Sequence, residues 1–297
     1  HTISRRQRQM CIRDRASGML LLKAPLLLPA AAAGLAAVGL GQEWRHWRLT
    51  TAAPTLLIGV LPGIAWHLWH AWHRGASALW LWGGDGAGRV LLDAGEGSDL
   101  GWRVPLIELL EGGWPWLLLF PIALFGAWHA RQSRWGYWSL STLAVLAAAI
   151  LPLRTQLPWY SHPLWLPFAL LCAPLLAWMV NRMPWPSGAV PMRRILAVIP
   201  ALWAGLGGLL LIAGVASLTP AAQALIDYRS PALAVGAGWC TGGILLMQNT
   251  QNRRQLGALS LVIGNVTALA IVFHDRESGH AVSYTHLTLP TTDRVYF

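Results

Sequence analysis

Long apolar runs recur along the whole chain, and they restrict its fold more than any other feature. A helix that crosses the hydrocarbon core of a bilayer needs about 20 consecutive, mainly apolar residues. Eight candidate runs lie at 17–41, 51–71, 114–129, 136–153, 163–180, 195–217, 231–247 and 256–273. The composition agrees, because 55% of the residues are hydrophobic and 11% are charged, which is unlike a soluble domain. The sequence therefore predicts an all-α, polytopic transmembrane bundle of about eight spans.

The two ends of the chain differ from this apolar body, and they are related to each other through their codons. A DNA strand that encodes residues 1–14 in frame has a reverse complement that encodes residues 282–295 without a mismatch. Such an inverted repeat resembles the transposon-end adapter used to prepare sequencing libraries. We expect 1–15 and 282–297 to be translated adapter and 16–281 to be native. Segments of this kind carry no information about the fold. The alternative, a basic N-terminal arm that binds nucleic acid or lipid head groups, does not explain the C-terminal match.

The end segments account for much of the apparent basicity. The whole chain has a formal net charge of +10, but six arginines and two aspartates lie in these ends, which leaves +6. This charge gives no reason to predict a nucleic-acid partner. Cys172 and Cys240 remain, both within apolar runs, and their spacing predicts neither a disulfide framework nor a zinc site.

Charged residues between the apolar runs predict the orientation in the membrane. Alternate loops hold nine arginines and a single acid, Glu43; the arginines are Arg45, Arg48, Arg131, Arg134, Arg182, Arg193, Arg194, Arg253 and Arg254. The other loops hold the remaining nine acids. By the positive-inside rule the arginine-rich loops are cytoplasmic. Residues 72–113, 153–162, 218–230 and 274–281 are then predicted to face outward.

Two cations on the predicted outer side are candidates for binding an anion. Lys23, the only lysine, lies in "LLKAPLLLP", and an ionisable group among apolar residues is a functional hypothesis. The alternative is a side chain that snorkels from a helix end to the interface. Arg89 lies in the glycine-rich "WGGDGAGRV", where backbone amides could approach a phosphate. Alternatively, this loop is a flexible polar connection followed by a short interfacial helix.

Three histidines follow one another at steps of three in "WHLWHAWH", namely His67, His70 and His73. Histidines on one helical face can bind a metal ion. Here tryptophans alternate with them at a helix end, which is typical of the aromatic belt at a membrane interface. We predict the aromatic belt and no metal site.

The segment "LRTQLPWYSHPLWLPFALL" at 153–171 resembles the "KLPxYxLPxxPxLALL" pattern of polyprenyl-phosphate-dependent glycosyltransferases of the GT-C type. That superfamily includes protein O-mannosyltransferases and the transferase that adds 4-amino-4-deoxy-L-arabinose to lipid A. "LLKAPLLLP", "WGGDGAGRV" and "GGWPWLLLFPIALFGAW" are similar to further segments of the superfamily, in the same order. Gln156 stands where the pattern has lysine, and the resemblance covers about 16–180.

The resemblance implies a GT-C-like bundle and a site for a lipid-linked sugar donor. Lys23 and Arg89 would lie near the carrier phosphate, and Tyr160 would line the carrier groove. The general base of the family is a carboxylate in the first outer loop, which would precede Ala16, so we expect the chain itself to be inactive. The donor is a substrate, and no cofactor is implied.

We therefore expect part of a membrane glycosyltransferase of the bacterial inner membrane that acts on a lipid, glycan or protein acceptor. A transporter or flippase for a lipid-linked sugar is the alternative, since it would also need a buried cation and outer loops. Inverted repeats would favour a transporter, and the sequence has none that we detect. A polytopic structural or assembly protein is a third alternative.

Overall fold

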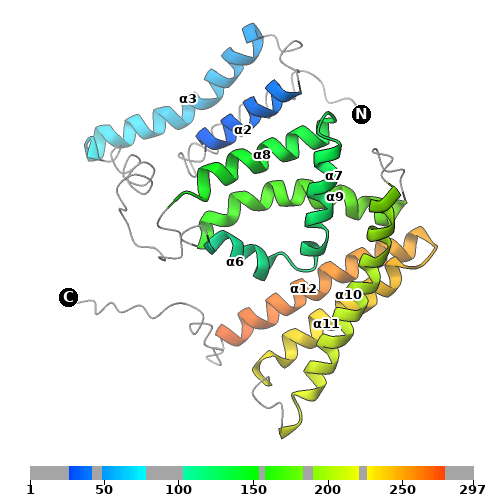
Figure 1. Cartoon of the computed structure of the whole chain (residues 1–297). Helices are drawn as coiled ribbons and strands as arrows, with labels where there is room; N and C mark the ends of the chain where they lie inside the picture. The colour runs from blue at the N-terminus through cyan, green and yellow to red at the C-terminus, as the bar shows by residue number, and fades with distance from the viewer. Residues whose placement is uncertain are drawn as a thin grey trace. The chain divides into compact units, whose positions relative to one another are not determined.

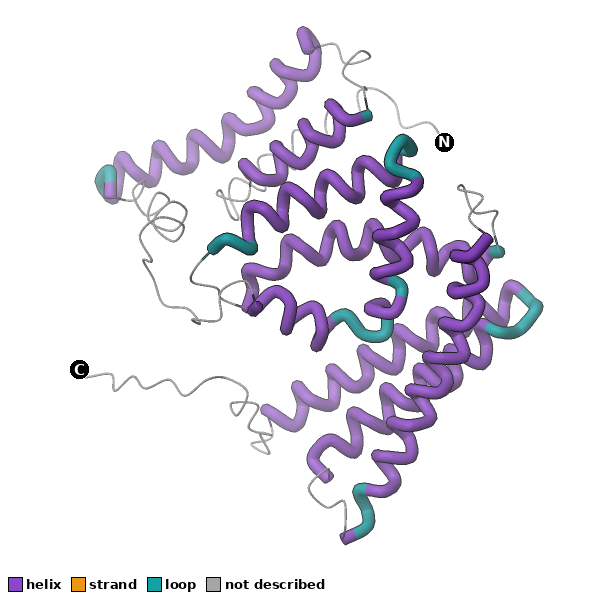
Figure 2. The backbone as a smooth tube through the Cα atoms, in the orientation of Figure 1, coloured by secondary structure: helices purple, strands orange, loops and turns teal. Residues whose placement is uncertain are grey.

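The protein is described by a computed structural model that covers residues 27–41, 49–77, 103–153, 158–182, 190–220 and 226–277. Every regular element within these ranges is helical (Figures 1 and 2). The elements are α2 (Leu27–Leu40), α3 (Leu49–Arg74), α6 (Arg103–Gly112), η4 (Trp116–Leu118), α7 (Phe120–His129), α8 (Arg134–Ile150), η5 (Pro158–Leu164), α9 (Trp165–Asn181), α10 (Val190–Ala216), α11 (Arg229–Leu246) and α12 (Gln251–Glu277). The predicted all-α class is thus confirmed over the described residues.

Each of the eight predicted apolar runs overlaps a helix, but fewer helices are long and apolar enough to cross a membrane. Three qualify within the described residues: Ser161–Asn181, Arg194–Ala216 and Gln251–His274. A fourth is added if Arg103–Gly112 and Trp116–His129 together form one broken span. The run at 17–41 is described only from Leu27 onward. Within the described residues the structure thus has three or four helices that are long and apolar enough to cross a membrane, and eight spans stays a prediction.

The described helices belong to two compact units. Unit 1 takes its residues from 1–112 and 127–170, and unit 2 takes its residues from 113–126 and 171–297. The segments 1–15 and 282–297 lie outside the described residues, so their assignment as translated adapter stays a prediction.

In unit 2, α10, α11 and α12 form an antiparallel bundle in which glycines let the backbones come close (Figure 1). A Cβ atom on Gly238 of α11 would lie 2.6 Å from Cα of Gly264 of α12. On the other side of α11, a Cβ atom on Gly207 of α10 would lie 2.7 Å from the carbonyl oxygen of Gly236. These positions have no room for a side chain, so glycine sets the spacing of the bundle. Small residues have this role where membrane helices associate.

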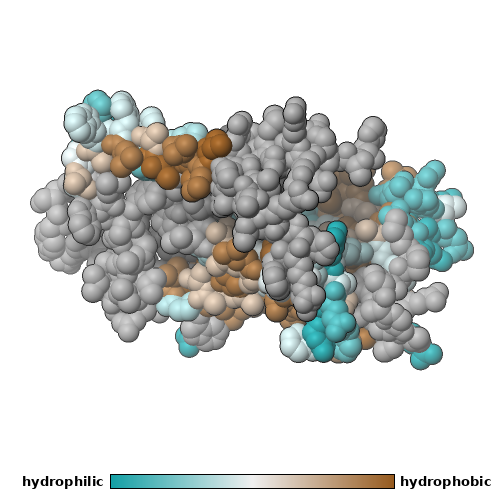
Figure 3. All heavy atoms as spheres, turned by 90° about the horizontal axis from the view of Figure 1, so that it is seen from above, coloured by the Kyte–Doolittle hydropathy of each residue, from teal (hydrophilic) through white to brown (hydrophobic). Residues whose placement is uncertain are grey.

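The outward faces of the same bundle are apolar. Leu209, Ile212 and Val215 of α10 are exposed, and so are Val262, Ile263 and Val266 of α12. Apolar side chains, coloured brown in Figure 3, reach the surface in the view shown there. Buried backbone with exposed aliphatic side chains is the reverse of a water-soluble bundle, and it suits a helix bundle whose solvent is lipid.

In unit 1, α2 packs against α8, and α8 begins at a conventional N-cap. Ser133 accepts a hydrogen bond at 3.1 Å from the backbone N–H of Gly136 through its hydroxyl. The end of α2 at Gly41 lies against the ring of Tyr137, which is buried. The α3 helix is more open, and its Trp72 side chain is 87% exposed. The contact of Gly41 with Tyr137 is thus one between backbone and side chain.

Candidate functional site at the junction of α6 and η5

The predicted site residues lie mostly beyond what the structure describes. Lys23 and Arg89 lie outside the described residues. The backbone of Tyr160 lies in η5, whereas its side chain is outside the description. The predicted convergence of these three residues on one cavity therefore stays a prediction. Contacts around η5 show which other groups accompany the segment that carries Tyr160.

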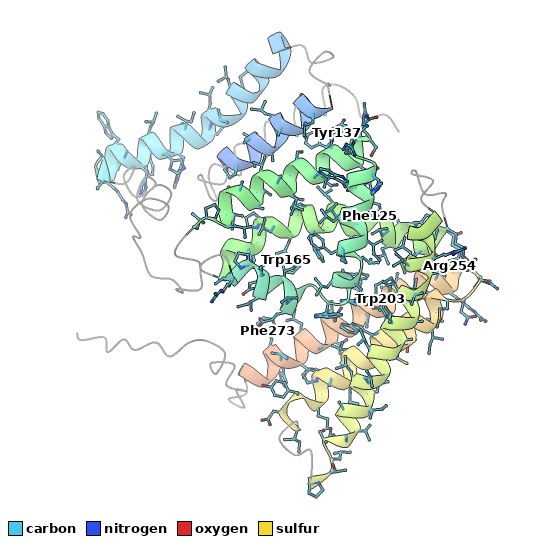
Figure 4. All side chains as sticks on the ribbon, in the orientation of Figure 1. Phe125, Tyr137, Trp165, Trp203, Arg254 and Phe273 are labelled. Atoms are coloured by element: carbon cyan, nitrogen blue, oxygen red, sulfur yellow. The ribbon has the colours of Figure 1, made fainter. Side chains whose placement is uncertain are left out.

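Helix α6 packs against η5 within unit 1, so the end of the 72–113 segment meets the 153–162 segment. Gly112 makes this approach possible, because a Cβ atom there would lie 3.1 Å from Cζ2 of Trp165. The Trp165 ring in turn meets Phe168 edge to face, with centroids 5.3 Å apart (Figure 4). The packing agrees with the prediction that both segments face the same side of the membrane.

The sequence of η5 explains why a tight, short helix lies at this point. Pro158 begins it, and proline suits a first helical position because it has no N–H to leave unpaired. Pro163 lies inside it and removes a donor that a continuing α-helix would need. The segment therefore forms a 3-10 helix before α9 starts at Trp165. Ser161 becomes buried as a result, and His162 stays exposed.

Three titratable groups gather at this junction: Glu108 and Glu111 of α6, and His162 of η5. Desolvation by burial raises the pKa of the half-buried Glu108, and the negative charge of Glu111 raises it further. His162 opposes this shift and lowers the pKa. The two glutamates share a helical face because they are three positions apart. A carboxyl group with a raised pKa exchanges a proton closer to neutral pH, which suits acid–base chemistry or hydrogen bonding to a sugar hydroxyl.

Neither Glu108 nor Glu111 stands out in the sequence among the nine acids of the predicted outer loops. The missed signal is the spacing in "PLIELLEGG", where both carboxylates fall on one side of a short apolar helix. Their partner His162 lies 51 or more positions away along the chain. Only the packing of α6 against η5 brings His162 to the two glutamates.

The histidines of α3 are arranged as an aromatic ladder. Trp66 and Trp69 have ring centroids 5.3 Å apart, and Trp69 and His73 have centroids 4.5 Å apart. Nδ1 of His73 donates a hydrogen bond at 2.9 Å to the carbonyl of Trp69. Within the part of the chain that the structure describes, no three His, Cys, Asp or Glu residues form a group that could hold a metal ion.

In unit 2, the "WPW" segment at 114–116 is held by an aromatic cluster. Trp203 of α10 is fully buried, and its indole N–H donates a hydrogen bond at 2.9 Å to the carbonyl of Pro115 (Figure 4). Trp116 meets the Trp203 ring edge to face at 5.9 Å. Trp114 lies 6.0 Å from Trp239 of α11, measured between ring centroids. This segment, which sequence reasoning related to a glycosyltransferase motif, thus has a clear packing role.

No family model, no curated protein and no solved structure matches this chain. The resemblance to polyprenyl-phosphate-dependent glycosyltransferases therefore stays a prediction from the motifs quoted from the sequence.

Proposed function

We propose that the chain is part of an integral-membrane glycosyltransferase of the bacterial inner membrane. It takes a sugar from a polyprenyl-phosphate donor and transfers it to a lipid, glycan or protein acceptor on the extracytoplasmic side. Its full bundle has about eight spans and a GT-C-like arrangement. The observation that supports the proposal best is the packing of α6 against η5. Through it, the segment that follows Arg89 meets the segment that contains Tyr160.

In the proposed reaction, an acceptor hydroxyl attacks the anomeric carbon of the sugar. The bond from that carbon to the phosphate oxygen breaks, and polyprenyl phosphate leaves with the electron pair. Lys23 and Arg89 hold the phosphate and stabilise its growing charge, while Tyr160 lines the groove for the carrier lipid. The proton of the acceptor goes to a carboxylate that acts as the general base. No cofactor takes part.

The proposal is tested by binding of a polyprenyl phosphate to the purified chain in detergent. Arg89→Ala should weaken binding by about ten- to a hundredfold, because a buried charge-assisted hydrogen bond is worth about 1.5–3 kcal/mol. Arg74→Ala is the matched control, since Arg74 is exposed in the same half of the chain. It should change binding by less than about fivefold. Equal effects of the two substitutions would refute the phosphate-binding role of Arg89.

A second assay separates the enzyme from the alternative lipid-sugar transporter. The chain is reconstituted into vesicles that contain a labelled polyprenyl-phosphate sugar, without any acceptor. Because a transferase binds the donor without moving it between leaflets, the label should stay on its original side. Movement of the label across the bilayer would overturn the transferase proposal in favour of a flippase.

A further inference from the structure

The end of unit 2 that contains the α11–α12 turn is rich in arginine. The C-terminal end of α9 meets this turn, with Gln251 donating a hydrogen bond at 2.9 Å to the Asn181 side chain. A guanidinium nitrogen of Arg182 lies 3.5 Å from the side-chain oxygen of Asn249. Both segments are predicted to be cytoplasmic, and their contact agrees with a common side.

The start of α10 lies at the same end. Gly243 of α11 packs against Pro200 and Ala204 of α10, in an antiparallel register. Extending this register by about two helical turns toward the start of α10 brings Arg194 level with the α11–α12 turn. Arg194 is exposed, as are Arg182 and Arg253.

Arg254, the fourth arginine, is only 5% exposed (Figure 4). Its Nε donates at 2.7 Å to the carbonyl of Val180, at the end of α9. Its Nη1 donates to the carbonyls of Gln248 at 3.2 Å and Asn249 at 2.6 Å. The guanidinium thus satisfies carbonyls that helix ends leave unpaired, where a positive charge is favoured.

This buried guanidinium keeps unused hydrogen-bonding capacity. Nη2 of Arg254 has no acceptor among the residues that the structure describes. Over 178–182, 190–198 and 246–256 the chain contains no aspartate or glutamate. A buried cation without a counter-charge is costly, so an anion supplied from outside the chain would stabilise this end.

We propose that these four arginines, the basic platform (Arg182, Arg194, Arg253 and Arg254), bind the phosphodiester head group of an anionic phospholipid in the cytoplasmic leaflet. Guanidinium groups match phosphate oxygens in geometry and charge. The exposed aliphatic faces of α10 and α12 lie beside the acyl chains of the same lipid. The platform is independent of the sugar-transfer proposal, since it uses other residues on the opposite predicted side.

The test is a titration of the purified chain with short-chain phosphatidylglycerol, using lipid-induced thermal stabilisation as the readout. The double substitution Arg182→Gln and Arg253→Gln removes two exposed cations and leaves Arg254 in place. Each basic residue near an anionic lipid surface is worth about 1 kcal/mol. The double variant should therefore bind about thirtyfold more weakly.

Arg74→Gln combined with Arg103→Gln is the matched control, because it removes the same charge from two exposed positions of unit 1 on the predicted outer side. This control should retain the affinity of the unchanged chain. Equal affinities in the platform variant and the control would overturn the proposal. So would equal stabilisation by phosphatidylcholine, which carries no net charge. Full competition by inorganic phosphate would indicate a free-anion site and would also overturn the lipid assignment. No sugar donor enters the assay, so its outcome is independent of glycosyl transfer.

Discussion

Helices pack by different means in the two units. In unit 2, backbone meets backbone across glycines, as where Gly238 faces Gly264. In unit 1, the corresponding close approach is between Gly41 and the side chain of Tyr137. Between lipid-facing helices the hydrophobic effect contributes little, so close fit and hydrogen bonds must hold them together. The close contacts of Gly207 and Gly238 therefore cannot accept a side chain, whereas the neighbour of Gly41 is a side chain that can move.

The largest expected effect is that of Gly207→Ala. The new Cβ would collide with backbone atoms of Cys240 and Gly236, and these cannot move without shifting α11. We expect a loss of about 3 kcal/mol in unfolding free energy, the upper part of the range for overpacking. Unfolding in mixed detergent would measure it.

Gly208→Ala is the control for this substitution, because a Cβ atom there would meet nothing within 4 Å. It should leave stability unchanged or raise it slightly, since alanine favours a helix more than glycine does. Similar losses for both variants would contradict the glycine-seam interpretation of unit 2.

Arg254→Met should have the next largest effect. The change removes three hydrogen bonds to backbone carbonyls and leaves those carbonyls without a donor. We expect a loss of about 2 kcal/mol in the free energy of unfolding, because hydrogen bonds to charged groups are worth about 1.5–3 kcal/mol. The exposed neighbour offers a matched variant, Arg253→Met, which should stay within about 0.5 kcal/mol of the unchanged chain. An equally mild effect at both positions would mean that Arg254 does not hold α9 to the turn.

The corresponding substitution in unit 1 is Gly41→Ala. We expect it to lower the free energy of unfolding by about 1 kcal/mol. The added Cβ would meet the ring of Tyr137, which is a side chain and can adjust. Adding Tyr137→Leu should remove the penalty of the alanine, as measured by a double-mutant cycle. No side-chain substitution should rescue Gly207→Ala in this way. Failure of the unit 1 rescue would make the two units alike.

The smallest effect concerns Glu108, whose pKa is raised above its ordinary value of 4.5 by burial and by Glu111. The folded state then holds the proton more tightly than the unfolded state. Stability contributed by this group is greatest below about pH 4.5 and falls as the pH rises through the raised pKa. Glu108→Gln should flatten that fall, as seen by comparing unfolding midpoints from about pH 4 to about pH 8. His162→Gln should shift the fall in stability to higher pH, because it removes the charge that lowers the pKa of Glu108.

The apolar runs predicted the helices well because their length and hydrophobicity are local properties of the chain. The same runs did not predict how α10, α11 and α12 fit together, although the spacing of Gly238 and Gly242 is a known signal for close helix contact. Glycine frequency alone does not say which glycines face a partner. The distinction between Gly207 and Gly208 comes only from the packing.

The burial of individual charged residues could not be predicted from the sequence. Positive-inside counting treated Arg253 and Arg254 alike, since both follow the same apolar run. The structure buries one and exposes the other, because only Arg254 points to the carbonyls at the end of α9. Likewise, the half-burial of Glu108 depends on η5, which is distant in the chain. The roles of Lys23, Arg89 and Tyr160 stay predictions.

The hydrogen bond from Trp203 to the carbonyl of Pro115 can form only after both residues have been synthesised. The two residues are 88 positions apart. At about 5–20 residues per second, the ribosome completes Trp203 about 4–18 s after Pro115. During that interval the carbonyl and the two flanking tryptophans must find temporary partners in water, in lipid or in the insertion machinery. The packing of the segment at 114–116 is therefore completed only after α10 has been synthesised.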